Sequence, residues 1–115
     1  MTGPRYHGKA AFDATVVQTI AAALQAQWDA DGELQRAAAT RGSVDETAPR
    51  TYADFALAIA GLLAAGGSEA EVSGYLRREE EQLLGAPRST GKVRWPIAKL
   101  AWRVVRGIGR DEDTP

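Results

Sequence analysis

The sequence predicts an all-α protein, a compact single-domain bundle of about four helices. Apolar residues recur at helical spacing through most of the chain, and no stretch shows the strict alternation of a half-buried strand. Alanine-rich segments are separated by short polar stretches that contain glycine or proline. A chain of 115 residues with 44% apolar residues is long enough for one hydrophobic core and too short for two.

The chain divides into three parts by composition. We predict a helical domain over residues 12–110, a flexible N-terminal arm over residues 1–11 and an acidic frayed tail over residues 111–115. The arm has no apolar core of a secretory leader, and the longest uncharged apolar run, residues 55–68, is shorter than the about 20 residues of a membrane span. These features favour a soluble protein of the cytoplasm.

The first predicted helix covers residues 12–39. Its apolar face repeats at every fourth position, at Phe12, Val16, Ile20, Leu24 and Trp28. Gly32 is expected to kink or end this helix, and the polar stretch 39–50, with a glycine and a proline, is expected to form a loop.

Two capped helices are expected to follow as an antiparallel pair. Thr51 and Asp54 resemble a capping box at the start of a helix over residues 52–65, which Gly66 and Gly67 end. Ser68 and Glu71 form a full Ser-x-x-Glu capping box for a third helix over 68–84. Gly85 and Pro87 stop that helix.

The fourth predicted helix lies in residues 94–110. Pro96 suits the first helical position, which makes Trp95 the N-cap residue. A helical wheel separates an apolar face from a basic face, with Trp102 at the border between them. The basic face consists of Lys99, Arg103, Arg106 and Arg110.

The net charge of −1 conceals a strong asymmetry. Residues 88–110 contain seven basic residues and no acidic residue, whereas residues 1–87 carry a net charge of −5. Such a chain either pairs its own halves or presents a basic face to a partner. An isoelectric point near 5.8 argues against a dedicated nucleic-acid-binding protein.

The residue inventory disfavours several kinds of catalytic and metal site. The chain has no cysteine, and its one histidine, His7, lies in the predicted arm, where a general base would lack fixed geometry. The stretch 85–92 lacks the order of a phosphate-binding loop. Residues 28–33 resemble a calcium loop, but two of its six ligands are missing. We therefore predict no cofactor, no metal and no enzymatic activity.

Glu79 is the acidic residue whose position is unusual. It falls within the apolar stripe of the third helix, and a carboxylate there needs a partner or a raised pKa. We expect it to pair with an arginine of the fourth helix, and alternatively to serve as a functional acid.

Part of the sequence resembles a family of small helical bacterial proteins of unknown function. The resemblance covers Trp28 to Gly85. Trp28, Asp29 and Gly32 match an early Trp-Asp-Pro-x-Gly motif, with alanine in place of the proline. Further matches are Tyr52 at a helix start and the Gly66, Ser68 and Glu71 turn, although Ala53 replaces an expected acid. The resemblance implies that Trp28, Asp29 and Tyr52 lie near one another, and it implies no activity.

The sequence thus favours a small interaction or accessory protein, of an adaptor or immunity type. The predicted binding residues are Lys99, Trp102, Arg103, Arg106 and Arg110, and the partner is an acidic protein surface or a second copy of the chain. One alternative is a small enzyme or ligand-binding protein with a pocket at Trp28, Asp29, Tyr52 and Glu79. Another is weak binding of nucleic acid or an anionic surface by the same basic helix.

Overall fold

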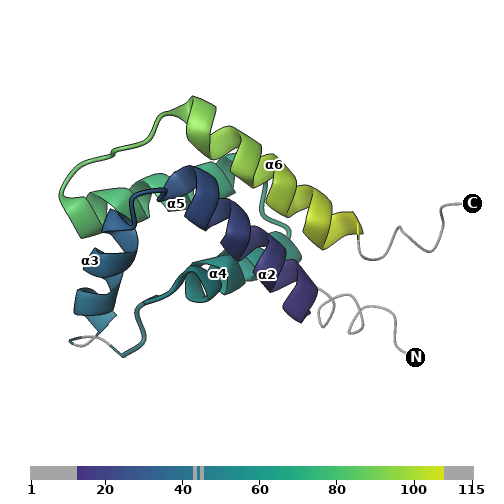
Figure 1. The fold of residues 1–115 in the computed structure, drawn as a ribbon. Coiled ribbons are helices and arrows are strands. Elements are labelled where there is room, and N and C mark those ends of the chain that lie inside the picture. The colour runs from purple at the N-terminus through teal and green to yellow at the C-terminus, as the bar shows by residue number, and fades with distance from the viewer. Residues whose placement is uncertain (1–12, 43, 45, 108–115) are drawn as a thin grey trace, which may run out of the picture.

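The computed structural model describes residues 13–42, 44 and 46–107. Within these residues the protein is all-α and compact, which confirms the predicted fold class, with five α-helices and one π-helical turn (Figure 1). The elements are α2 (Ala14–Ala23), η1 (Leu24–Trp28), α3 (Glu33–Gly42), α4 (Tyr52–Ala64), α5 (Glu69–Leu84) and α6 (Gly91–Gly107). The predicted arm and tail, with His7 and Arg110, lie outside the described residues.

The first predicted helix is interrupted at residues 29–32, in agreement with the expected kink or end at Gly32, and forms α2, η1 and α3. The amide of Asp29 donates to the Leu24 carbonyl over 2.9 Å, which closes the wide π turn. Gly32 then adopts a left-handed backbone with φ of 76°, a conformation that costs glycine little. The chain therefore turns before α3, and α3 continues to Gly42, beyond the predicted start of the loop.

The predicted α4–α5 pair is confirmed in its caps. Complete capping boxes start both helices, from Thr51 with Asp54 and from Ser68 with Glu71. At the end of α4, the Gly67 amide donates to the Leu62 carbonyl over 2.9 Å. A β-carbon on Gly67 would lie 2.1 Å from a Leu62 methyl carbon, so this tight turn has no room for a side chain.

Helix α6 begins at Gly91, so the predicted N-cap at Trp95 is wrong. The amides of Val93 and Arg94 both donate to the Thr90 carbonyl, which starts the helix one turn earlier. Pro96 lies inside the helix. Its missing N–H leaves the Lys92 carbonyl without a helical partner, but both residues are exposed, so water can pair that group.

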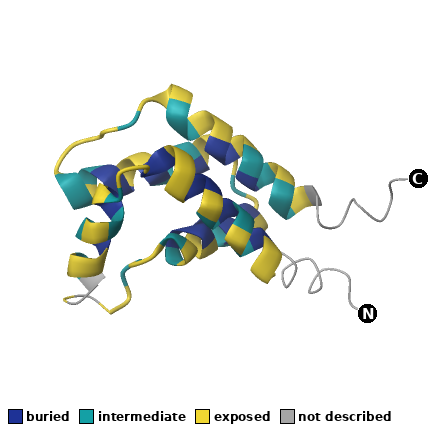
Figure 2. Cartoon of the chain, viewed as in Figure 1, coloured by how far each residue is buried: buried dark blue, intermediate teal, exposed yellow. Residues whose placement is uncertain are grey.

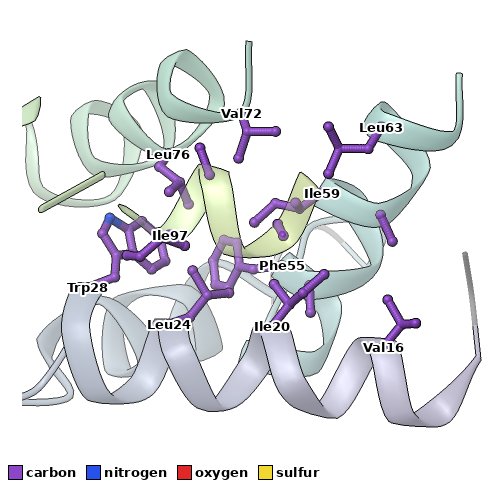
Figure 3. Close-up of a cluster of buried hydrophobic side chains, with 14 of the residues drawn as sticks. Val16, Ile20, Leu24, Trp28, Phe55, Ile59, Leu63, Val72, Leu76 and Ile97 are labelled. Atoms are coloured by element: carbon purple, nitrogen blue, oxygen red, sulfur yellow. The ribbon is translucent and has the colours of Figure 1, made fainter. Parts of the chain in front are cut away.

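The hydrophobic core is one cluster to which every helix contributes (Figure 2). Figure 3 shows Val16, Ile20, Leu24 and Trp28 extending from the same side of α2 and η1 toward the other helices. Trp28 packs edge-on against Phe55, with ring centroids 5.3 Å apart. The core also contains Leu34, Ala38, Ala56, Ile59, Ala60, Leu63, Val72, Leu76, Ile97, Ala98 and Ala101.

The core positions α6 with one face inward and one face outward. Ile97, Ala98 and Ala101 are buried against the other helices, whereas Lys99 and Arg103 are exposed. The two-faced pattern expected from the helical wheel is therefore present. None of the helices described is long and apolar enough to cross a membrane.

Candidate functional site

The basic segment that begins at residue 88 forms two different environments, and the first is a buried polar network around Glu80. Glu80 lies on α5 and is fully buried. Its Oε1 accepts hydrogen bonds from the amides of Arg88 at 2.7 Å and Ser89 at 2.8 Å. Its Oε2 accepts from the Trp28 indole Nε1 at 2.6 Å and from the Ser89 hydroxyl. The carboxylate therefore joins η1, α5 and the loop before α6.

Four donors keep Glu80 ionised despite its burial. Burial alone would raise the pKa of this carboxyl, but hydrogen bonds from Ser89, Trp28 and Arg88 outweigh burial and lower the pKa below its ordinary value. Arg94 of α6 adds a guanidinium nitrogen 3.9 Å from Oε1, and the same nitrogen donates to the Ser89 carbonyl over 2.6 Å. The negative charge is thus compensated within the fold.

Asp29 is the second buried carboxylate, and its side chain caps the start of α3. Its two oxygens accept from the amides of Leu34 at 2.9 Å and Gln35 at 2.8 Å, the positions that need acceptors at a helix start. The Tyr52 hydroxyl donates to it over 2.8 Å. Burial and this carboxylate raise the pKa of Tyr52 to about 12. The structure therefore brings Asp29 and Tyr52 together beside Trp28.

Arg88 closes the acidic turn at residues 29–33. Its guanidinium lies 3.2 Å from Asp29, 3.0 Å from Asp31 and 3.0 Å from Glu33, and it also donates to the Trp28 carbonyl over 2.9 Å. The stretch that resembles a calcium loop thus holds an arginine of the chain at its acidic groups. No cluster of three or more potential metal-binding side chains occurs in the described part of the chain.

Glu79 does not pair with α6, so the expected partner is wrong. It is bound by Arg41 of α3, whose guanidinium lies 3.0 Å from the carboxylate and also donates to the Pro49 carbonyl over 3.2 Å. The end of α3 packs against this part of α5, whereas Arg94 of α6 lies beside Glu80.

An open cavity of about 350 Å³ lies at residues 46–58, and none of the four predicted pocket residues lines it.

The second environment is the outer side of α6. Lys99, Arg103 and Arg106 are exposed, and Trp102 is half-buried. The Arg106 guanidinium lies 5.6 Å from the centre of the Trp102 ring, a cation–π contact. The predicted binding residues other than Arg110 therefore share one solvent-facing surface.

Sequence reasoning missed two members of this outer surface and three members of the buried network. Lys92 and Trp95 lie on the same side of α6, and Trp95 is 42% exposed. Glu80, Arg88 and Ser89 also carry more contacts than the predicted Glu79. The pattern that could have identified Glu80 is its position four residues after Leu76 and eight after Val72, on the buried stripe of α5.

Comparisons with protein-family models, curated proteins and solved structures gave no significant match.

Proposed function

We propose that this protein is a small helical interaction protein, of an adaptor or immunity type, that binds an acidic surface of a protein partner. The binding surface is the outer side of α6, with Lys99, Arg103, Arg106 and Trp102, and Arg110 is predicted to extend it. The role proposed is binding without catalysis or cofactor, in the cytoplasm.

One observation carries the proposal. Among the described residues, no carboxylate pairs with Lys99, Arg103 or Arg106. Arg88 and Arg94, from the same basic segment, are both paired within the fold. With no carboxylate partner in the described part of the chain, the outer cations can attract an anionic surface and increase the rate of encounter with it.

The tryptophans support a protein partner. Binding surfaces are enriched in tryptophan and arginine because these side chains bury a large area and also donate hydrogen bonds. Trp95 and Trp102 stand among the cations of this surface. Because α6 has no acidic residue, an acidic partner would meet no like charge along the helix.

The test is affinity capture from the native host with charge-reversed baits. The full chain and the variant K99E/R103E/R106E are compared at low and moderate salt, and the control R36E/R50E/R78E has the same change of net charge on other exposed arginines. We expect a partner retained by the wild type and the control and lost by the α6 variant. Equal retention by all three proteins would contradict the proposal.

Nucleic acid is the other outcome that this design detects. If the retained material is nuclease-sensitive and its binding falls steeply with salt, counterion release at a phosphate backbone accounts for it. That result would replace the protein partner by nucleic acid on the same surface.

A further inference from the structure

The exposed side of α6 carries a regular seam that the basic face alone does not describe. Its members are Lys92, Trp95, Lys99, Trp102 and Arg106, and successive members are separated by three, four, three and four residues. Four are exposed, and Trp102 is half-buried. This alternation is the heptad spacing by which one helix packs along another.

The seam lies beside the face that closes the core and borders it at Trp102, which packs against the core. Ile97, Ala98 and Ala101 turn inward and are buried, while Arg103 flanks the seam on the exposed side. Cations and tryptophans alternate along the seam over about 21 Å, given a rise of 1.5 Å per residue. It would therefore offer a second helix alternating sites for carboxylates and for apolar side chains.

We infer that the partner presents an acidic amphipathic α-helix, which packs lengthwise on this seam with carboxylates at the cations and apolar side chains at the tryptophans. The inference rests on the proposed function and specifies the chemistry and shape of the partner. Charge complementarity supports it, because α6 has no acidic residue and no described carboxylate pairs with Lys92, Lys99 or Arg106.

A protein helix fits this surface better than a lipid membrane. Membrane-surface helices bury a continuous apolar face, and their affinity scales with that apolar area. Here the aliphatic residues Ile97, Val104 and Val105 of α6 lie in the core or pack against it, and the exposed seam has two tryptophans separated by cations. Within the exposed seam, basic residues and tryptophans alternate, so the seam itself has no continuous apolar surface.

The first experiment compares two designed acidic peptides of three heptads with the full-length protein. In the first peptide, leucine and glutamate alternate at three- and four-residue spacing, so that they form one seam. The second peptide has the same composition, with these residues distributed around the whole helix. Circular dichroism is used to confirm that the two peptides have equal helicity. We expect the seam-matched peptide to bind about tenfold more tightly, a difference of about 1.4 kcal/mol. The indole N–H resonances of Trp95 and Trp102 should shift, while that of Trp28, bonded to Glu80, should not.

The second experiment fixes the pairing by a charge swap. Lys99→Glu should weaken binding of the matched peptide about tenfold, because attraction is replaced by repulsion. A peptide with lysine at the facing position should restore it. Arg78→Glu makes the same charge change on an exposed residue of α5 and should have no effect.

The outcomes separate this inference from the proposed function. If both peptides bind equally, the helical seam is wrong while an acidic partner is retained. If neither peptide binds, the inference is overturned, and the affinity capture alone decides the proposed function. Preferential binding to vesicles that contain phosphatidylserine, without peptide selectivity, would overturn both in favour of a lipid surface.

Discussion

Arg88 and Arg94 differ from Lys99, Arg103 and Arg106 in what surrounds them, although all five belong to one basic segment. Arg88 contacts the buried Asp29 in the turn after η1, and Arg94 lies beside the buried Glu80 of α5. The last three face solvent, without a carboxylate partner in the part of the chain that the structure describes. Part of the positive charge of this segment is therefore compensated by carboxylates within the fold, and part faces solvent.

The neighbouring helices explain this division. The loop before α6 places Arg88 at the turn of residues 29–33, and the first turns of α6 place Arg94 beside Glu80 of α5. Helix α6 also packs against α2, which has no acidic residue, and against α4, whose one acid, Asp54, is used in a capping box. A basic residue is thus paired only where an acidic element passes it.

The largest effect is expected for Glu80→Gln, which alters the buried polar network around Glu80. The NH₂ group of the glutamine side chain would face the hydrogen-bond donors of Trp28, Arg88 and Ser89. At least one of these three residues would therefore lose its acceptor. We expect a loss of about 3 kcal/mol in the free energy of unfolding, measured by urea titration. Glu81→Gln, at a half-exposed pair with Arg77, should cost less than about 0.5 kcal/mol. Equal costs would contradict the contrast between buried and exposed charge.

A second test compares an arginine that is paired within the fold with an arginine on the exposed side of α6. Arg88→Met should cost about 2 kcal/mol, because Asp29 is fully buried and loses its cation, although the partial exposure of Arg88 moderates the effect. Arg103→Met should leave the free energy of unfolding within about 0.5 kcal/mol of the wild type. Thermal and urea unfolding of both variants decide the point, and a large loss for Arg103→Met would reveal an internal partner.

The pH dependence of stability offers a third test. Because the folded pKa of Glu80 is lowered, its contribution is present above the unfolded pKa and is lost as the pH falls through the folded pKa. Below about pH 4 this one group should steepen the loss of stability by up to about 1.4 kcal/mol per pH unit. Glu80→Gln should flatten that limb, and an unchanged slope would exclude Glu80 as its source.

The smallest effect is expected at Arg106. Arg106→Gln removes the cation above the Trp102 ring and should cost about 0.5 kcal/mol. The tryptophan emission spectrum should change because Trp102 loses its charged neighbour, while Lys99→Gln serves as the control. An identical spectrum for Arg106→Gln would show that the contact is absent in solution.

Local rules were sufficient to predict most of the fold. Capping boxes set the starts of α4 and α5, and Gly66 with Gly67 and then Gly85 set their ends, because these signals act over only a few residues. The start of α6 was missed because Pro96 fits both a first turn and an exposed interior position, and the bonds to Thr90 that decide between them are not visible in the sequence.

The candidate site was predictable in part. The wheel placed Lys99, Arg103 and Arg106 on one face, since that face follows from helix geometry alone. The partners of Glu79 and Glu80 depend on which elements meet in space, and Arg41 and Trp28 are far from them in sequence. Neither pairing could be derived from the periodicity of a single helix.

The π turn at Leu24–Trp28 holds one residue more than a regular helical turn, which bears on the chain lengths that this part of the fold accepts. Gln25, Ala26 and Gln27 face solvent and would tolerate many substitutions. Because Asp29 bonds to Leu24 where a regular helix would use the residue before it, deleting one of them would close a regular helical turn and leave Trp28 and Asp29 near their present directions. Deleting two of them would rotate Trp28 and Asp29 by about 100° relative to Glu80 and Arg88. The turn can thus lose one residue but not two, so homologues should differ there by substitution and by deletion of a single residue.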